Sequence, residues 1–520
     1  MVRAMAEPLR QAGSRAVMTT GEGQYDLAII GGGINGAGIA CDAAGRGLSV
    51  VLLEAGDLAG ATSSASSKLI HGGLRYLEQR EFRLVREALH EREVLLAKAP
   101  HIIRPLRFVL PDVASLRPRW MIRLGLFLYD HLSSRVTIPG SGALDLAHDT
   151  AGRPLKRSFS HGFSYWDCWV DDARLVVLNA RAAADRGADI RTRTRFLDAR
   201  AEDGLWRLRY RAQAAGETGE IRARAIVNAA GPWADRVLPA ANGRAATNSA
   251  RLRLVKGSHV VVPRIEGATD AYILQQDDRR VVFVLPFEEK FSLIGTTDVP
   301  FTGDPTDIRA DAAEIDYLLA SVNRYFATEL ATGDIVWSYA GVRPLFDDEA
   351  ASASEVTRDY RLVLSDDAGR PPLLSVFGGK ITTYRRLAEE ALERLEHAFP
   401  DMGRPWTAGT PLPGGGLPEG GMDTFLVALG QRYPRIDPST IARLARRHGT
   451  LVETLLGDTK EPGDLGTHFG AGLYEREVVY MRDSEWARSA DDILWRRTKA
   501  GLHMTEAERH RAADAIEKLL

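Results

Sequence analysis

Cysteine is scarce in this chain of 520 residues, with Cys41 and Cys168 as its two cysteines. Two cysteines cannot form a disulfide framework or a cysteine-rich metal site, so the sequence predicts a protein of a reducing cytoplasm with no bound metal. A strong charge of either sign is also lacking, because 67 lysines and arginines stand against 69 aspartates and glutamates, for a formal net charge of -2. This balance argues against a nucleic-acid-binding protein.

Long hydrophobic runs and internal repeats are absent as well. No window approaches the roughly 18 apolar residues that cross a bilayer, so we expect no membrane span. The first residues contain no apolar run long enough for a signal peptide, and we expect residues 1–24 to be a disordered extension or a cloning remnant. At 520 residues the chain is too long for one hydrophobic core, so it predicts two or three domains.

What the sequence does contain is a dinucleotide-binding pattern at residues 26–54, which read DLAIIGGGINGAGIACDAAGRGLSVVLLE. An apolar strand, a glycine-rich turn, a helix of small residues and a second strand end in an acid. Gly31 allows the tight turn, Gly33 lets the backbone approach a pyrophosphate, and Gly36 brings helix and strand close together. The helix N-terminus directs free N–H groups at the phosphates, and Glu54 can accept hydrogen bonds from ribose hydroxyls.

The segment after this motif favours FAD over NAD. From Gly56 it reads GDLAGATSSASSKLIHGGLRYLE, a stretch rich in Gly, Ser and Thr that can wrap a long cofactor with backbone and hydroxyl donors. An NAD domain would go straight on into the next strand and helix. A solvated surface loop is disfavoured, because Leu69, Ile70 and Leu74 are interleaved with the polar residues and indicate burial.

The remaining pattern predicts a Rossmann-like FAD-binding domain interleaved with an antiparallel-sheet substrate domain, followed by a C-terminal helical domain. Residues 221–233 read as a strand with a small-residue turn, and residues 252–298 read as antiparallel strands. Residues 375–396 read as a strand, a double glycine and an amphipathic helix. We expect the FAD-binding domain at about 25–100, 165–235 and 355–400, the substrate domain at 101–164 and 236–354, and the helical domain at 401–520 after a Pro/Gly linker at 410–421.

The most unusual composition lies at residues 105–132, which read PLRFVLPDVASLRPRWMIRLGLFLYDHL. At about 100° per residue, Arg119, Arg123 and Asp130 fall on one stripe of a helix, and apolar side chains cover most of the rest. An aromatic and aliphatic surface flanked by arginines suits a helix at an anionic membrane interface, the flanking residues being Arg104, Arg107, Arg117 and Arg119. The periodicity alone leaves a buried core helix equally open.

Nine ordered segments together closely resemble the aerobic FAD-dependent glycerol-3-phosphate dehydrogenases: GGGINGAG, ATSSASSKLIHGGLRYLE, RWMIRLGLFLYDHL, NAAGPW, KGSH, GTTD, YAGVRPL, TRDY and FGGKITTYR. That family belongs to the glutathione-reductase-like flavoproteins, in the branch of the D-amino acid and glycine oxidases. The resemblance implies oxidation of sn-glycerol 3-phosphate to dihydroxyacetone phosphate by hydride transfer to FAD. It also implies a homodimer attached peripherally to the inner face of the cell membrane, to an anionic lipid surface, that passes electrons to a membrane quinone.

This reaction assigns roles to residues of the motifs. A substrate phosphate calls for guanidinium partners, and the resemblance places Arg75, Arg343 and Arg358 around the substrate, with Tyr76 as a hydroxyl partner. Lys380 opens a helix after the double glycine, where its charge and the helix dipole would stabilise negative charge on the reduced flavin or on a substrate oxygen. The expected cofactor-binding residues are Gly31, Gly33, Asn35, Gly36, Glu54, Thr62, Ser63, Ser64, Ser67, Lys68, Gly231, Gly378, Gly379, Lys380 and Thr382.

For the general base, the KGSH segment favours His259, because an unperturbed imidazole titrates near neutrality and the resemblance places this residue close to the substrate. His71, beside Gly72 and Gly73, is the alternative. Other functions also stay open. A FAD-dependent oxidase of the same branch would use oxygen, or would act on an amino or hydroxy acid whose carboxylate Arg343 could hold. A membrane-associated flavin-binding sensor would show no turnover.

Overall fold

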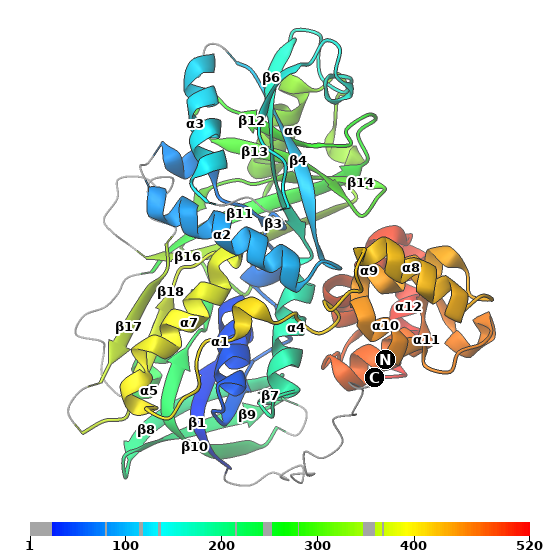
Figure 1. The fold of residues 1–520 in the computed structure, drawn as a ribbon. Coiled ribbons are helices and arrows are strands. Elements are labelled where there is room, and N and C mark those ends of the chain that lie inside the picture. Colours follow the sequence, from blue (N-terminus) through cyan, green and yellow to red (C-terminus); the bar gives the residue numbers. More distant parts are fainter. Residues whose placement is uncertain are drawn as a thin grey trace, which may run out of the picture.

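The computed structural model describes residues 23–78, 81–113, 118–133, 137–213, 216–242, 252–278, 280–346, 359–366 and 369–520. Nearly all of the extension expected at residues 1–24 lies outside them, and the first strand already begins at Gly23. Two large sheets and a helical C-terminal unit make up the fold, as expected from the sequence (Figure 1).

The first sheet has a parallel centre, in the strand order β17-β18-β10-β1-β2-β7. Its strands are β1 (Gly23–Ile30), β2 (Val50–Leu53), β7 (Asp189–Arg191), β10 (Thr218–Asn228), β17 (Arg361–Ser365) and β18 (Leu373–Phe377), with the antiparallel β8 (Thr194–Glu202) and β9 (Leu205–Ala212) added along β10. Both faces of its centre are covered, which explains the unbroken apolar runs of β1 and β2. Leu27 and Ile29 pack into one core, and Ala28 and Ile30 into the other.

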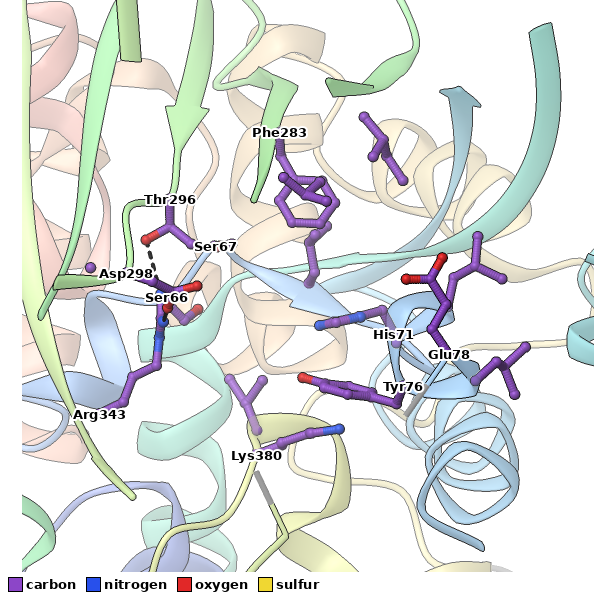
Figure 2. A pocket seen from close by; sticks show the side chains of 18 of the residues that line it. Ser66, Ser67, His71, Tyr76, Glu78, Phe283, Thr296, Asp298, Arg343 and Lys380 are labelled. Carbon is purple, nitrogen blue, oxygen red and sulfur yellow. Dashed lines mark hydrogen bonds and ion pairs between the residues drawn. The ribbon is translucent and has the colours of Figure 1, made fainter. Parts of the chain in front are cut away.

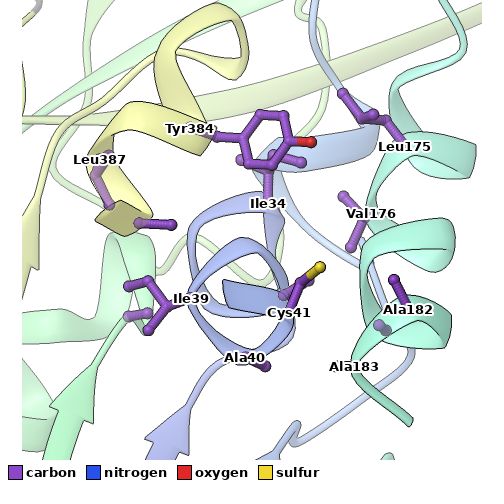
Figure 3. Close-up of a cluster of buried hydrophobic side chains, with 14 of the residues drawn as sticks. Ile34, Ile39, Ala40, Cys41, Leu175, Val176, Ala182, Ala183, Tyr384 and Leu387 are labelled. Carbon is purple, nitrogen blue, oxygen red and sulfur yellow. The ribbon is translucent and has the colours of Figure 1, made fainter. Parts of the chain in front are cut away.

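Three helices cover one face of this sheet: α1 (Ile34–Gly45), α4 (Asp172–Ala184) and α7 (Tyr384–Arg394) (Figure 3). The small residues of α1 let its neighbours approach closely. A Cβ atom at Gly38 would lie 2.7 Å from the ring of Tyr384. The opposite face packs against Val237 and Ala241 of α5 (Ala234–Asn242).

The second sheet is antiparallel except where β12 pairs with β4 in parallel. Its strands are β3 (Leu69–Ile70), β4 (Ile103–Pro111), β5 (Gly142–Asp145), β6 (His161–Val170), β11 (Leu252–Pro263), β12 (Ala271–Gln275), β13 (Val281–Phe287), β14 (Phe291–Gly295), β15 (Val299–Pro300) and β16 (Trp337–Phe346). The domain boundary expected at residue 165 falls inside β6, and β3 belongs to this sheet although residues 25–100 were expected in the FAD-binding domain. Helices α2 (Phe82–Lys98), α3 (Arg119–His131) and α6 (Ala312–Tyr325) accompany it.

Helix α3 is not the buried core helix that the periodicity left open. Ile122, Leu126 and Tyr129 pack inward, whereas Trp120 is 69% exposed and Leu124 and Phe127 are each 50% exposed. No helix in the described part of the chain is long and apolar enough to cross a membrane.

The arginines expected to flank this helix make contacts of their own. Arg104 lies over the ring of Trp169, and Arg107 forms ion pairs with Asp149 and Asp270. Arg119 pairs with Asp112, and Arg117 lies outside the described residues. The exposed face of α3 carries Trp120, Leu124 and Phe127 together with the exposed Arg119 and Arg123.

The C-terminal unit consists of α8 (Gly421–Arg432), α9 (Pro438–His448), α10 (Val452–Leu456), α11 (Glu475–Ser484) and α12 (Glu506–Glu517), with a small hairpin of β19 (His468–Gly470) and β20 (Leu473–Tyr474). A π-helical turn at Asp492–Arg497 returns to the main body. The Pro/Gly segment at 410–421 is packed in place, because Leu412 is buried in the core of the first sheet and the carbonyl of Gly414 accepts a hydrogen bond from the amide of Thr450.

Candidate active site

A cavity of about 550 Å³ lies between the two sheets. Its walls come from the loop after β2, from residues around β3, from α3, from strands of the second sheet and from the turn after β18 (Figure 2). Parts of the chain that are far apart in the sequence therefore share one pocket. Of the predicted site residues, Thr62, Ser63, Ser67, His71, Tyr76, His259, Arg343, Gly379 and Lys380 line it.

The glycine-rich turn leads into this pocket and cannot carry side chains. Gly31 has φ +109°, and a Cβ atom there would lie 2.5 Å from the carbonyl oxygen of Ala229. A Cβ atom at Gly36 would lie 1.9 Å from the carbonyl oxygen of Gly31. At Gly33 it would lie 3.1 Å from Ser63 Oγ, so the turn and the following loop are fitted together.

Glu54 shapes the same turn. One of its carboxylate oxygens accepts a 2.6 Å hydrogen bond from the amide of Gly32 and the other accepts one of 2.6 Å from the amide of Gly56. Each carboxylate oxygen keeps a second lone pair, which leaves capacity for a ribose hydroxyl. The acid therefore joins the glycine turn to the cofactor loop, which we define as residues 55–68.

Hydroxyl groups of the cofactor loop tie it to the rest of the pocket. Thr62 donates to the carbonyl of Val342 at 2.7 Å, and Ser63 Oγ accepts from the amide of Ile34 at 3.0 Å. Ser64 bonds back to the carbonyl of Ala61 and does not reach the pocket wall.

Lys68 was expected to contact the cofactor, and the structure shows its side chain paired with Asp172. Its Nζ atom is fully buried, 2.8 and 2.9 Å from the two carboxylate oxygens of Asp172, and it also donates to the carbonyl of Ser64. Lys68 is absent from the pocket lining. Its charge anchors the loop from behind.

A second glycine turn lies at the end of β18. Gly378 and Gly379 have φ +72° and +97°, and Asn35 Nδ2 donates to the carbonyl of Gly378 at 3.3 Å. Gly231, with φ +55°, forms the small-residue turn after β10. The glycine turns thus converge on the N-terminus of α1, where glycine alone accommodates the positive φ without strain.

The helix expected to open at Lys380 starts later. Residues Ile381–Thr383 form a single 3-10 turn, and α7 begins at Tyr384, so the dipole of a long helix does not begin at the lysine. Thr382 is buried, and its Oγ1 accepts a hydrogen bond from the amide of His71 at 3.2 Å. Thr382 therefore positions His71 instead of lining the pocket.

Lys380 points toward Tyr76 across the pocket (Figure 2). Its Nζ atom lies 3.6 Å from the centroid of the Tyr76 ring, a cation–π contact. Gly73 makes room for that ring, because a Cβ atom there would lie 2.1 Å from it.

Arg343, on β16, approaches from the opposite wall (Figure 2). Its guanidinium forms an ion pair with Asp298, and it donates to Thr296 Oγ1 at 3.0 Å. Gly257 of the KGSH segment pairs with Gly341 across β11 and β16, two residues from Arg343, and a Cβ atom at Gly257 would lie 2.4 Å from the guanidinium. The glycine therefore creates the space that the arginine occupies.

His259 is buried in the pocket wall. Its Nε2 atom lies 2.9 Å from Ser67 Oγ, and its ring stacks on that of Tyr339 with centroids 4.8 Å apart. Burial, and then the charges of Arg343 and Lys68, hold the imidazole pKa well below its usual value. The expectation of titration near neutrality is therefore wrong, although a neutral imidazole is the form that can accept a proton.

His71 is half-buried and faces the cavity near Tyr76 and Glu78 (Figure 2). Its backbone is held between Thr382 and α3, since the hydroxyl of Tyr129 accepts a 2.8 Å hydrogen bond from the amide of Gly72. The side chain of Arg75 and the whole of Arg358 lie outside what the structure describes. Their expected substrate contacts stay predictions.

Sequence reasoning missed several residues of this pocket. Thr296 and Asp298 belong to the GTTD segment, which carried no assigned role, and Glu78 and Phe283 also line the cavity. Gly295 precedes Thr296, and a Cβ atom there would lie 2.1 Å from the His259 ring. Both KGSH and GTTD contain a glycine, and this shared feature was the sequence signal that the two segments pack closely against the pocket residues.

The residues present fit FAD. The glycine turns form a tight backbone cradle, since a Cβ atom at Gly31 or Gly36 would meet the backbone of the turns, and Gly33 lies beside the Ser63 hydroxyl of the cofactor loop. Asn35 Oδ1 is buried and accepts no hydrogen bond within the described part of the chain. Orphaned buried acceptors of this kind are rare, so a donor from a bound group is expected there.

Comparison with known proteins agrees with this geometry. Residues 26–385 match the family model of FAD-dependent oxidoreductases, and residues 406–520 match the C-terminal domain of alpha-glycerophosphate oxidase. The D-erythritol 1-phosphate dehydrogenase of Brucella abortus is 53% identical over 93% of this chain and 96% of its own length. The glycerol-3-phosphate dehydrogenase of Pseudomonas aeruginosa is 53% identical over 95% of both chains, and the aerobic glycerol-3-phosphate dehydrogenase of Escherichia coli is 52% identical over 94% and 96%.

A solved structure is also similar over almost the whole chain. The glycerol-3-phosphate dehydrogenase of Bacillus halodurans, complexed with FAD, has a TM-score of 0.73 and 26% identity, and the match covers 95% of this chain and 94% of that one. From the family match, the near full-length relatives and the cradle of glycines, we conclude that this chain belongs to the FAD-dependent oxidoreductase family.

Proposed function

We propose that this flavoprotein oxidises sn-glycerol 3-phosphate to dihydroxyacetone phosphate. The observation that carries the proposal is the placement of Arg343 and Lys380, which bring two cationic side chains to one pocket that His71 and His259 also line. A small phosphorylated alcohol needs such cations. The relatives named as glycerol-3-phosphate dehydrogenases support the same substrate.

When bound, FAD would supply the redox chemistry as the hydride acceptor for the carbinol carbon. The protein binds and orients the substrate and moves a proton. Arg343 offers its guanidinium fork to the phosphate, with Asp298 and Thr296 fixing its position. Lys380 and Tyr76 face the substrate oxygens from the other wall.

His259 is our candidate for the group that takes the hydroxyl proton, because it lines the pocket and its imidazole is neutral, although the lowered pKa makes it a weaker base than an ordinary histidine. Ser67, at 2.9 Å from Nε2, holds the ring in place. His71 remains the alternative base, since it also lines the pocket.

A four-carbon polyol phosphate is the second candidate substrate. The relative named D-erythritol 1-phosphate dehydrogenase is as similar to this chain as the glycerol-3-phosphate dehydrogenases are. Glu78 lies on the pocket wall near His71, where its carboxylate could accept a hydrogen bond from an additional hydroxyl (Figure 2).

The test is anaerobic addition of each substrate to the purified flavoprotein. Loss of the oxidised-flavin absorption band with sn-glycerol 3-phosphate, at a lower concentration than with D-erythritol 1-phosphate, supports the first candidate, and the reverse order supports the second. Bleaching by an amino or hydroxy acid alone would replace both with an oxidase-type substrate. A spectrum unchanged by every substrate would favour a sensor without turnover.

The electron acceptor and the location are further parts of the proposal. Met121, Leu124 and Leu128 of α3 line the pocket, and Leu124 is also half exposed on the outer face. An apolar surface therefore runs from the cavity to the outside. This continuity supports a peripheral enzyme that docks α3 on lipid and passes electrons to a membrane quinone.

Reoxidation of the reduced enzyme distinguishes the acceptors. We expect a short-chain ubiquinone analogue to restore the flavin band faster than air-saturated buffer does. Faster reoxidation by oxygen would make the protein an oxidase. The proposed homodimer is tested separately by light scattering of the purified protein, where a monomeric mass would contradict it.

A further inference from the structure

The C-terminal unit forms buried ion pairs with the loop that contacts the cofactor. Its contact region comprises the π-helical turn Asp492–Arg497 and the next two residues, and we name residues 492–499 the clamp segment. The clamp segment is far from the cofactor loop in the sequence, because its ion pairs join residues that are 439 and 440 positions apart.

Arg497 makes the central contact. Its two terminal nitrogens donate to the two carboxylate oxygens of Asp57 at 2.6 and 2.8 Å, in the planar bidentate geometry that arginine favours. The side chain is fully buried, and one nitrogen also donates to the carbonyl of Glu485 at 2.7 Å. Arg496 adds a 2.6 Å bond to the same carboxylate.

Asp57 is directly connected to the phosphate-binding turn. The next residue, Leu58, is buried against Gly32, since a Cβ atom at Gly32 would lie 3.0 Å from the leucine side chain. Ala59 donates its amide to the carbonyl of Gly32 at 3.1 Å. Asp57, which the clamp segment holds, therefore directly precedes the two residues, Leu58 and Ala59, that contact Gly32 of the glycine turn.

A second connection holds the other end of the cofactor loop. Lys499 donates to Asp171 at 3.2 Å, and Asp171 caps the start of α4 by accepting from the amide of Arg174. The adjacent Asp172 accepts from Ser66 Oγ at 2.8 Å and pairs with Lys68. Both ends of the loop are therefore fixed, one directly and one through α4.

We propose that the clamp segment positions the cofactor loop for FAD, and that Arg497 is the residue through which the C-terminal unit raises FAD affinity. Without Arg497, Asp57 keeps one bond to Arg496 and loses the buried bidentate contact, so the loop around Asp57 would be held less firmly in one conformation. If the loop is ordered in only a fraction of the FAD-free protein molecules, the apparent affinity for FAD decreases in proportion to that fraction. This proposal rests on FAD binding and does not depend on which substrate is oxidised.

The experiment compares Arg497→Met and Arg497→Lys with Arg432→Met, whose wild-type arginine forms an exposed ion pair with Glu453 in the same C-terminal unit. The FAD dissociation constant is measured by titrating FAD into each deflavinated full-length protein and following flavin fluorescence. We expect Arg497→Met to weaken FAD binding by about 5- to 150-fold, within the range of coupling between linked sites. Arg497→Lys should be intermediate, because it keeps the charge and loses the fork, and Arg432→Met should match the wild type.

Two further measurements on the FAD-free protein distinguish an effect on overall stability from an effect on the cofactor loop. They are the thermal unfolding midpoint, measured by circular dichroism, and the rate of proteolytic cleavage within residues 55–68. Faster cleavage of the loop in a folded Arg497→Lys protein supports the proposal, even if Arg497→Met does not fold. A lowered unfolding midpoint with an unchanged FAD dissociation constant in Arg497→Lys overturns it. A double-mutant cycle of Asp57→Asn and Arg497→Met tests whether the two residues act together on FAD affinity. The proposal is supported if the double variant binds FAD as weakly as each single variant does, and it is contradicted if the two losses of affinity add.

Discussion

The Nζ atom of Lys380 lies 3.6 Å from the centroid of the Tyr76 ring. This contact joins the turn after β18 to the segment after β3, which are about 300 residues apart in the sequence. It orients the ammonium group across the pocket instead of toward solvent. The positive charge therefore acts where a substrate oxygen or the reduced cofactor would carry negative charge.

Replacement of Lys380 by Met should lower kcat by about 100- to 1000-fold, as removal of one electrostatic stabiliser does in other enzymes. FAD should stay bound, which the visible spectrum checks. Tyr76→Leu should lower kcat by about 2- to 30-fold through loss of the cation–π contact. Steady-state kinetics with an artificial dye acceptor measures both effects, and an effect of Tyr76→Phe as large as that of Tyr76→Leu would show that the hydroxyl matters more than the ring.

Replacement of Arg343 by Ala should mainly raise KM for sn-glycerol 3-phosphate. Loss of a charge-assisted contact of roughly 1.5 to 3 kcal/mol corresponds to a decrease of about 10- to 150-fold in kcat/KM. Arg432→Ala provides the control, because that arginine forms an exposed pair far from the pocket. Unchanged kinetics in Arg343→Ala would remove this residue from the phosphate site.

Replacement of His259 by Gln should lower kcat by about 100- to 10,000-fold, with a smaller effect on KM, if this imidazole is the general base. Its pKa is lowered by burial and by the charges of Arg343 and Lys68. A base must be unprotonated, so in the wild type the rate should decrease with acidity only at a pH well below the usual histidine range. A pH–rate profile of His259→Gln that keeps the wild-type acid limb would transfer the role to His71.

The free energy of unfolding should depend on His101, which is buried near His448 and Arg174 and has its pKa lowered to about 3. The unfolded chain takes up a proton near the ordinary value of about 6.5, whereas the folded chain does not. The contribution of His101 to the free energy of unfolding is therefore complete above a pH of about 6.5. It decreases below that pH by up to about 1.4 kcal/mol per pH unit.

Urea unfolding between pH 7 and pH 5 measures this dependence. His101→Gln should flatten the decrease, whereas replacement of the exposed His397 should leave it unchanged. A wild-type pH dependence retained in His101→Gln would show that other groups cause it.

Replacement of both Leu124 and Phe127 by Asp should abolish binding to vesicles that contain anionic lipid. Each side chain is 50% exposed on α3, and the change leaves the packed face of Ile122, Leu126 and Tyr129 intact, although Leu124 also lines the pocket. Val427→Asp is the matched control, since Val427 is 62% exposed on α8 in the C-terminal unit. Cosedimentation with vesicles reports binding, and the flavin spectrum shows whether the variant is folded. Retained binding would exclude α3 as the docking surface.

The sequence was most informative where the structure is local. The strand, glycine turn, helix and acid at residues 26–54 are contiguous, and the two tightest glycines of the turn meet nearby backbone, Gly36 that of Gly31 and Gly31 that of the adjacent β10 turn. The strand-like segments of β11 to β14 likewise predicted an antiparallel sheet. Backbone sterics and the two-residue strand period act over short distances, so the residues themselves determine these elements.

The tertiary structure decided which polar groups share an environment. Lys68 reads as a cofactor contact in the sequence, but Asp172 lies behind it and buries it. His259 reads as a histidine titrating near neutrality, but burial and two neighbouring cations lower its pKa. Nothing in the sequence indicated a role for Arg497, whereas in the structure its Nη1 atom lies 2.6 Å from Asp57 Oδ2. Burial and pairing depend on groups brought together from hundreds of residues away, and in a medium of low dielectric constant those neighbours set the charge state and partner of each side chain.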